Sequence, residues 1–491
     1  MNRRIVDKIW FERATLVISG RGSVPCARFV SDGGGVFEPT ECVSSGSRFE
    51  VRFDVISGFG GRPLSSGWWR LECPDTDFEV DPLPEHDYSC NGDAYKLSLT
   101  YENGDVCMVS QFCARPTSAK IRLITLLLRA AFSVCRPFRP RKQPRIIFTS
   151  ESRRNLNGNM RYIYDELQRR EEGKQYQIIP FFCRPGAFAD YLKCACLLST
   201  ADIIVTDDYH PGLYRLKYPD GVKIFQVWHA CGAFKTVGYS RSGTNGSPRI
   251  GGPAHRCYTH AIVSSDRVRR YYSEAFGISM DRVYATGVPR TDALLSDNYL
   301  TDAKSLIKSL FGDLGGKRII LICPTFRGDG ASSAYYPYEQ IDFNALYQLC
   351  RRTDSVAIFK IHPFVKDPPP IPDRCRDLLF DGSGIREIND ILAAADVIVT
   401  DYSSVIYEAS ILGKPMLFYT FDLEEYIASR DFYEPFDSFV PGEICRTFEE
   451  LISRLDGEVN NSKSLAFRHR NFDRLDGKAS ARVVDLILGK E

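Results

Sequence analysis

The chain repeats one pattern twice, in which short, continuously apolar runs alternate with stretches of helical periodicity. The apolar runs are residues 145–150, 176–183, 201–208 and 222–229 in the first copy, and 317–325, 355–363, 396–404 and 414–420 in the second. Strands that are apolar on both faces and alternate with helices form parallel sheets covered by helices. The sequence therefore predicts an α/β protein with two doubly wound, Rossmann-like domains that face one another across a cleft, the GT-B architecture.

A chain of 491 residues has room for these two domains and a further one. The first 116 residues contain alternating runs at 48–55, 66–73, 95–102 and 106–113, separated by turn-forming residues. This spacing indicates an N-terminal β-sandwich-like accessory domain. We divide the chain into an accessory domain (1–116), a basic amphipathic helix and linker (117–144), a first Rossmann-like, acceptor domain (145–300) and a second, donor domain (301–491).

The segment 118–145 is apolar and then basic, and no Asp or Glu occurs between Asp105 and Glu151. An apolar helix followed by basic residues favours a peripheral anchor on an anionic membrane surface. An ordinary packed helix with a solvated basic linker is the alternative.

Several classes of protein are disfavoured by the sequence. The N-terminus resembles no signal peptide, and no apolar run is long enough to span a bilayer, so we expect a peripheral protein on the cytoplasmic face of the membrane. The cysteines lack zinc-site spacing and are expected to be reduced and buried. We expect no metal and no cofactor. The net charge of +1 gives no reason to expect a nucleic-acid partner.

Polar residues follow the ends of the predicted strands. His229 ends one strand, and Arg327 and His362 follow strands of the second copy. In sheets of this type ligands bind at the carboxyl ends of the strands. The Asp-Tyr-Ser-Ser turn opens a predicted helix, where free N–H groups bind anions. The candidate donor-binding residues are Arg327, Lys360, Thr400, Asp401, Ser403, Ser404 and Glu408.

These groups suit phosphoryl transfer to a hydroxyl. A neutral histidine removes a hydroxyl proton near neutral pH, and cations and donors stabilise charge on phosphate oxygens. We therefore predict His229 and His362 as catalytic residues. Glu408 is expected to hold the ribose hydroxyls of a nucleotide, and Asp401 to orient a neighbour. No nucleotide-triphosphate-binding loop motif is present.

Six motifs resemble the CDP-glycerol glycerophosphotransferases, which build teichoic acid and related polyol-phosphate polymers. They are "VWHACGAFKTVGYS" (227–240), "GVPRTD" (287–292), "CPTFRGD" (323–329), "KIHPF" (360–364), the run 400–426 and the run 475–487. The resemblance spans about 145–488. It implies a GT-B fold, CDP-glycerol or a related CDP-polyol as donor, and a lipid-linked or polymeric acceptor at the membrane.

The resemblance also implies roles for individual residues. His229 would be the base for the acceptor hydroxyl, and His362 would hold the donor diphosphate together with Ser403 and Ser404. Gly232 and Lys235 would contact the acceptor. Many members of the family have "WHGTPLK" where this chain has "WHACGAFK", so the acceptor stays open.

Three functions remain open at this point. The leading one is transfer of glycerol phosphate from CDP-glycerol with release of CMP. The second is transfer from CDP-ribitol or another activated donor in capsule synthesis. The third is a non-catalytic scaffold that binds polymer. Addition of one unit and addition of many are equally compatible with the sequence.

Overall fold

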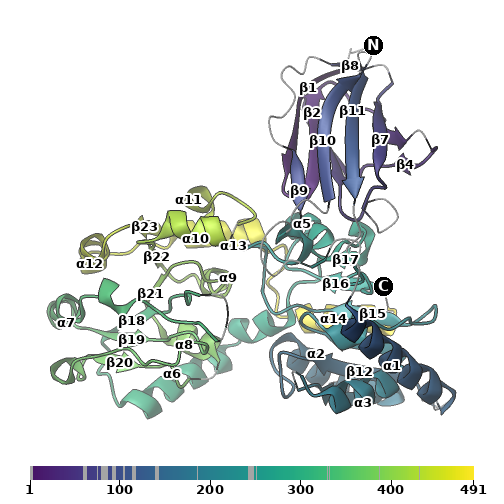
Figure 1. The fold of residues 1–491 in the computed structure, drawn as a ribbon. Helices are drawn as coiled ribbons and strands as arrows, with labels where there is room; N and C mark the ends of the chain where they lie inside the picture. The colour runs from purple at the N-terminus through teal and green to yellow at the C-terminus, as the bar shows by residue number, and fades with distance from the viewer. Residues whose placement is uncertain are drawn as a thin grey trace.

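The computed structural model describes residues 4–31, 33–58, 63–74, 76–78, 87–90, 95–102, 105–112, 118–138, 143–184, 186–241, 248–249, 252–328, 330, 332–385, 387–430 and 432–490. Two lobes lie side by side, and an N-terminal β region stands on one of them (Figure 1).

The N-terminal region contains two sheets that share one buried core. Among the described residues of this region, every strand pair is antiparallel except the β1–β8 pair. The four strands expected here correspond to β6, β7, β10 and β11. One sheet has the order β5(Glu41–Ser45)–β6(Arg48–Asp54)–β2(Thr15–Arg21)–β1(Arg4–Glu12)–β8(Thr76–Phe78). The other has the order β4(Val36–Phe37)–β3(Arg28–Ser31)–β7(Gly67–Glu72)–β11(Asp105–Phe112)–β10(Tyr95–Glu102)–β9(Tyr88–Cys90).

The first lobe contains a parallel sheet, as predicted, and this sheet has six strands, of which β16 and β17 were not expected. Its order is β13(Gln177–Phe182)–β12(Arg145–Ser150)–β14(Ile203–Thr206)–β15(Lys223–Gln226)–β16(His260–Ile262)–β17(Val283–Tyr284). Its helices are α1(Ala119–Cys135), α2(Gly158–Arg169), α3(Phe188–Leu198), α4(Pro211–Tyr214) and α5(Asp266–Phe276). The strand order reverses between β12 and β14, which is where ligands bind in such sheets.

The second lobe contains a second six-stranded parallel sheet. Its order is β20(Leu379–Asp381)–β19(Ser355–Phe359)–β18(Arg318–Ile322)–β21(Val397–Thr400)–β22(Met416–Tyr419)–β23(Glu443–Cys445). Its helices are α6(Asp297–Phe311), α7(Phe343–Arg352), α8(Ile388–Ala394), α9(Ile406–Ile411), α10(Leu423–Ser429), α11(Phe436–Phe439), α12(Phe448–Asp456) and α13(Ser462–Asn471). The order reverses between β18 and β21, so Thr325 and Asp401 lie at the switch point.

The last helix, α14(Ala479–Leu488), returns to the first lobe. Val483, Val484 and Ile487 are buried in the same core as Ile146 of β12 and Met160 of α2. The predicted division assigned this end of the chain to the second domain. Its apolar face instead completes the helical cover of the first sheet.

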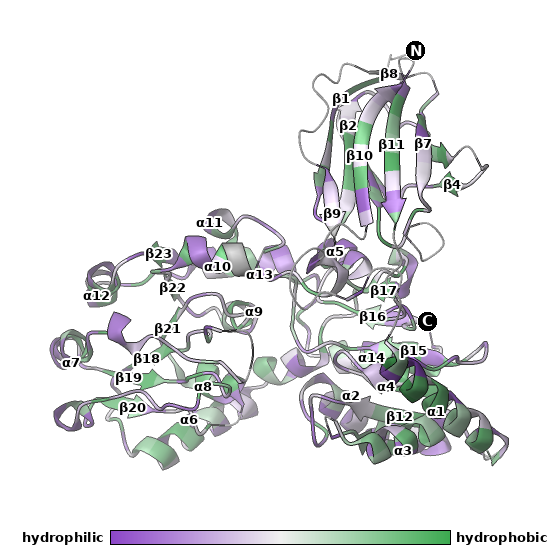
Figure 2. Cartoon of the chain, viewed as in Figure 1, coloured by the Kyte–Doolittle hydropathy of each residue, from purple (hydrophilic) through white to green (hydrophobic). Residues whose placement is uncertain are grey.

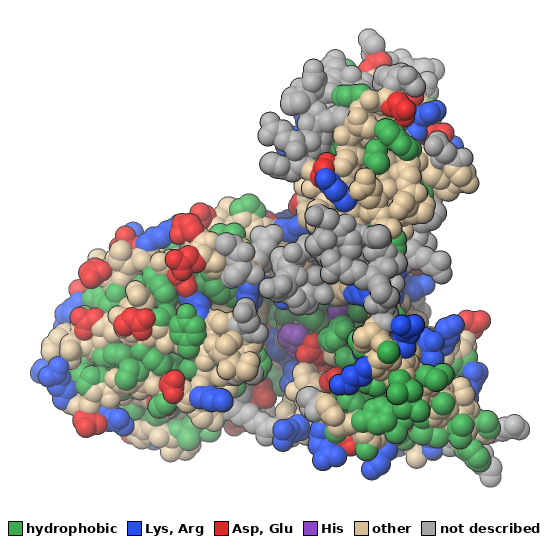
Figure 3. All heavy atoms as spheres, in the orientation of Figure 1, with side chains coloured by type: hydrophobic (Ala, Val, Ile, Leu, Met, Phe, Trp, Pro, Cys, Tyr) green, Lys and Arg blue, Asp and Glu red, His purple; other side chains and the backbone are tan. Residues whose placement is uncertain are grey.

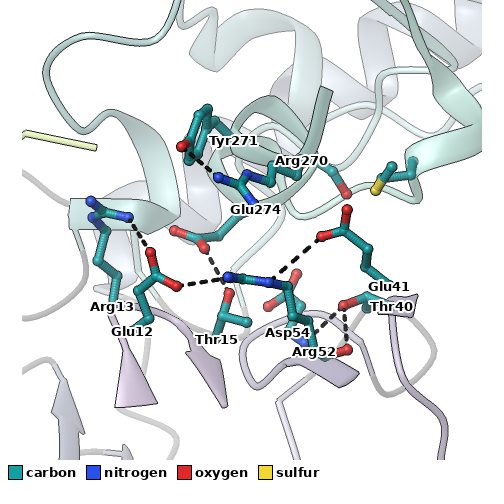
Figure 4. A pocket seen from close by; sticks show the side chains of 12 residues that line it. Glu12, Arg13, Thr15, Thr40, Glu41, Arg52, Asp54, Arg270, Tyr271 and Glu274 are labelled. Carbon is teal, nitrogen blue, oxygen red and sulfur yellow. Dashed lines mark hydrogen bonds and ion pairs between the residues drawn. The ribbon is translucent and has the colours of Figure 1, made fainter. Parts of the chain in front are cut away.

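The N-terminal sheets contact the first lobe through charged groups around α5 (Figure 4). Thr15 donates a hydrogen bond of 2.7 Å to Glu274 of α5, which is half-buried. Next to this contact, Arg52 forms a 2.8 Å ion pair with Glu12 within the N-terminal sheets. The Arg13 guanidinium donates to the Phe432 carbonyl of the second lobe at 2.7 Å. The β1–β2 turn therefore contacts both lobes.

The expectation that all cysteines are reduced is wrong at one pair. Cys135 at the end of α1 and Cys196 in α3 form a disulfide. The two helices pack against each other, which brings together two cysteines that are 61 residues apart in sequence. Twelve other described cysteines are free.

Candidate functional site

His229 lies just beyond the carboxyl end of β15, and its side chain is 44% exposed. The ring packs on Trp228, with centroids 4.4 Å apart. Nδ1 is 3.4 Å from the Asp207 carbonyl and 3.9 Å from the Asp208 carboxylate. Because a carbonyl only accepts, the proton of the neutral ring belongs on Nδ1. Nε2 then carries the lone pair, which is the state that a general base needs.

The turn that presents His229 is held in an uncommon conformation. Trp228 has a φ of 45°, a region that large side chains rarely occupy and that costs about 1–3 kcal/mol. Asn159 of α2 is buried, and its amide donates 2.8 Å hydrogen bonds to the carbonyls of Val227 and Trp228. Asn159 therefore fixes the direction in which His229 leaves the sheet.

The loop after His229 crosses to the second lobe. A Cβ on Gly232 would lie 2.2 Å from the Tyr407 ring, so no larger residue fits there. The Phe234 ring packs 4.8 Å from that of Phe432, and Lys235 Nζ donates to the Tyr426 hydroxyl at 3.3 Å. Gly232 is buried at this junction rather than on an acceptor surface, because the aromatic side chains of the second lobe cover it.

His362 follows β19 in the second lobe, and its ring packs against Phe326 and Phe364. Nδ1 accepts a 3.2 Å hydrogen bond from the Phe364 backbone N–H, so the neutral ring carries its proton on Nε2. Burial and the positive charges of Lys235, Lys360 and Arg430 lower the pKa of His362 to about 4. His362 is thus a neutral hydrogen-bond donor in cationic surroundings. Of the three cations that lower the pKa of His362, Lys235 belongs to the first lobe.

Lys360, Ser403 and Ser404 are the predicted donor-site residues whose side chains can still take a ligand. Lys360 is 6% exposed, and burial lowers the pKa of its ammonium group. Within the described part of the chain no side-chain hydrogen bond or ion pair occupies that ammonium. Both serines are partly exposed in the turn before α9. The turn leads into α9, a helix of only six residues.

Three predicted donor-site residues are already paired with protein groups. The Arg327 guanidinium forms ion pairs with Asp401 at 2.9 Å and with Asp422 at 2.6 Å. Asp401 also accepts from the Thr325 backbone N–H at 2.7 Å. Thr400 donates to the Cys323 carbonyl at 2.8 Å. These residues shape the strand-end loops instead of presenting free groups to a phosphate, because strand ends also need internal partners for their buried polar groups.

Glu408 is also engaged, in this case across the two lobes. Its side chain is 3% exposed and forms an ion pair with Arg290 of the first lobe. The Cys231 thiol donates to the same carboxylate at 3.2 Å. The expected ribose contact is therefore not what the side chain makes in this structure. The ion pair joins the helix after the Ser-Ser turn to the segment Pro289–Leu295, and the Cys231 hydrogen bond joins the same carboxylate to the loop after His229.

Sequence reasoning missed several residues of this region. Asn159 and Asp208 support the site but lie in none of the six motifs. Arg290 lies in the motif 287–292 and Asp422 in the run 400–426, yet neither was singled out, because their partners are distant in sequence. Figure 3 shows a hollow between the lobes with histidine side chains inside it. The two tautomers are complementary, since His229 offers a lone pair and His362 offers an N–H. Such a pair can deprotonate a hydroxyl and stabilise a phosphate oxygen.

Comparison with known proteins identifies relatives. A family model described as CDP-glycerol:poly(glycerophosphate) glycerophosphotransferase matches residues 130–489. The teichoic acid ribitol-phosphate polymerase TarK of Staphylococcus aureus is 44% identical over 73% of this chain and 71% of its own length. The teichoic acid poly(ribitol-phosphate) polymerase of Bacillus spizizenii is 41% identical over 75% of this chain, but the match spans only 60% of that longer protein.

A solved structure of a variant of the wall teichoic acid polymerase TagF has the same fold. The TM-score is 0.61 at 19% identity, over 76% of this chain and 98% of that one. The region that matches the family model, residues 130–489, includes both parallel sheets and all the catalytic, donor-binding and acceptor-binding residues predicted from the sequence. The chain belongs to the CDP-glycerol:poly(glycerophosphate) glycerophosphotransferase family.

Proposed function

We propose that this protein transfers ribitol phosphate from CDP-ribitol to a hydroxyl of a polyol-phosphate acceptor, with release of CMP, on a GT-B scaffold. The observation that carries the proposal is the pair of complementary histidines on facing lobes. The ribitol donor is favoured over the glycerol donor expected from the motifs, because relatives that are 41% and 44% identical are named ribitol-phosphate polymerases. Their names also favour repeated addition over a single one.

His229 would act on the acceptor. Its Nε2 takes the proton of the attacking hydroxyl while Nδ1 donates to the Asp207 carbonyl. The Asp208 carboxylate, 3.9 Å away, stabilises the imidazolium that forms. The new bond joins the acceptor oxygen to the β-phosphorus, and the bond from that phosphorus to the bridging oxygen breaks.

His362 would act on the donor. Its Nε2–H donates to a diphosphate oxygen, and Lys360, Lys235, Ser403 and Ser404 add positive charge and further donors. Charge that develops on phosphate oxygens is stabilised most by donors that are already fixed in place. With its pKa lowered to about 4, His362 is neutral near pH 7 in the ligand-free protein, so it offers the donor a directed hydrogen bond from Nε2.

The test is CMP release from CDP-ribitol with a polyol-phosphate acceptor. His229→Ala should lower the rate at least about 10²-fold, the lower end of the effect of a general base. His469→Ala is the matched control, since His469 lies exposed on α13. Undiminished CMP release by His229→Ala would contradict the assignment of His229 as the base. An equal loss of CMP release in both variants would contradict it too, because the loss would then not be specific to His229.

We also propose that α1 places the enzyme on the anionic, cytoplasmic face of a membrane. Leu128 and Phe132 bury one side of α1 in the first lobe, while Leu123, Leu126 and Val134 are 57–66% exposed. Figure 2 shows α1 as a largely hydrophobic helix, and Figure 3 shows hydrophobic side chains gathered on that lobe. The helix is therefore packed on the domain, as the alternative expected, but also presents an apolar surface beside basic residues. Among the described residues no helix has the length and apolarity needed to cross a bilayer.

A further inference from the structure

Three buried side chains that the proposed mechanism does not use converge at the carboxyl edge of the first sheet. Cys183 follows β13, Cys194 lies in α3 and His210 precedes α4. Each is no more than 1% exposed, and one potential ligand atom from each lies within 4.8 Å of the other two. Sequence spacing did not reveal them because three different elements supply them.

We propose that Cys183, Cys194 and His210 bind a zinc ion. Two thiolates and an imidazole are a ligand set that zinc prefers. Zn–S bonds of about 2.3 Å and Zn–N bonds of about 2.0–2.1 Å in a tetrahedron place donor atoms about 3.6–3.8 Å apart. Since the ligand atoms lie within 4.8 Å of one another, each separation needs to shorten by at most about 1.2 Å.

The two ring nitrogens of His210 have different surroundings. Nδ1 lies 3.0 Å from the Glu151 carboxylate, and Nε2 lies 2.9 Å from the Thr149 hydroxyl. That hydroxyl is 3.7 Å from Cys194 Sγ, so Nε2 faces the thiols. A ligating histidine commonly donates its other N–H to a carboxylate, which fixes the ring and raises its basicity. Nε2 is accordingly the ligand atom. Nδ1 would carry the proton, and the Glu151 carboxylate lies 3.0 Å away from it without an aligned hydrogen bond.

Glu151, the carboxylate beside the ligand His210, is itself held in place by hydrogen bonds. The Tyr191 hydroxyl donates to one carboxylate oxygen at 2.8 Å, and the Gly212 N–H donates to the other at 3.2 Å. The Thr149 hydroxyl borders the same space and would fill the fourth position or hold a water molecule there.

The ion would stabilise the loop that serves His229. His210 is three residues beyond Asp207, whose carbonyl meets His229 Nδ1. A metal bound to His210 would tie this loop to β13 and α3. Its role is structural, because three protein ligands and Thr149 close the site within the core.

The test is the zinc content of the full chain, purified without a histidine tag after expression with zinc and measured by mass spectrometry of the metal. We expect about one zinc ion per chain. Cys183→Ser and Cys194→Ser should lower this content at least tenfold. Cys350→Ser, at a buried thiol of α7 outside the cluster, should leave it unchanged. Glu151→Gln should weaken zinc affinity about 10–100-fold.

A second measurement does not depend on the folding of the variants. Cobalt(II) substituted into the wild-type chain should give thiolate-to-cobalt charge-transfer absorption. Wild-type protein with less than a tenth of a zinc ion per chain and no such band would overturn the proposal. A Cys183–Cys194 disulfide in peptide mapping would overturn it as well. Neither readout depends on transferase activity.

Discussion

The buried ion pair between Arg290 and Glu408 offers a sharp test, because the sequence and the structure assign Glu408 different roles. A ribose contact predicts that Glu408→Ala raises KM for the donor and leaves stability unchanged. The structure predicts a stability loss, since the substitution leaves the buried Arg290 guanidinium without its carboxylate. Breaking a buried pair by removing one partner costs about 3–5 kcal/mol.

The assay is urea unfolding followed by fluorescence and by circular dichroism. Glu408→Ala should lower the free energy of unfolding of the lobes by about 3–5 kcal/mol. Glu458→Ala, at an exposed position, should change it by less than about 0.5 kcal/mol. Replacing both partners, Arg290→Met with Glu408→Leu, should recover most of the loss because neither charge is left unpaired. An unchanged midpoint with a raised donor KM in Glu408→Ala would refute the reasoning and restore the ribose role.

Three further predictions follow from the site and from α1. His362 has a pKa of about 4 when folded and about 6.5 when unfolded, so protons bind the unfolded chain more tightly. The contribution of His362 to the free energy of unfolding is therefore complete above pH 6.5 and is lost as the pH falls toward 4. His362→Asn should make the free energy of unfolding less dependent on pH between these values. An unchanged dependence would exclude the lowered pKa. Asn159→Ala should lower kcat, because it misplaces His229, and should leave the KM for the donor unchanged. Asn159→Gln should not restore kcat, because its longer side chain does not place the amide on the carbonyls of both Val227 and Trp228. Leu126→Glu should reduce sedimentation with anionic vesicles, because it removes exposed apolar surface and adds a charge that the lipid repels. High salt should weaken sedimentation of the wild-type chain, and binding of Leu126→Glu equal to wild type would rule out α1 as the contact.

The sequence predicted the parallel sheets well because short, continuously apolar runs that alternate with helices are typical of strands buried on both faces of a sheet. The sites of Thr325, Asp401 and His229 at strand ends followed from the same pattern. The partners of these residues did not, since Arg327 meets Asp422 across 95 positions and Arg290 meets Glu408 across 118. Such pairs depend on how the loops cross between the lobes.

The same limit explains α14 and the cysteines. An amphipathic helix at the end of the chain fits either sheet, and only the packing of Val483 and Val484 decides in favour of the first. Cys135 and Cys196 become neighbours only because α1 packs on α3. Local patterns specify elements, whereas the contacts between elements require the fold.

The central claim is tested most directly by kcat/KM for CMP release from CDP-ribitol and from CDP-glycerol with one poly(ribitol phosphate) acceptor. The account predicts a value for CDP-ribitol at least about tenfold higher, a difference of about 1.4 kcal/mol in transition-state binding. It also predicts products that lengthen with time. A preference for CDP-glycerol would contradict the donor assignment, and no CMP from either donor would contradict the proposed reaction.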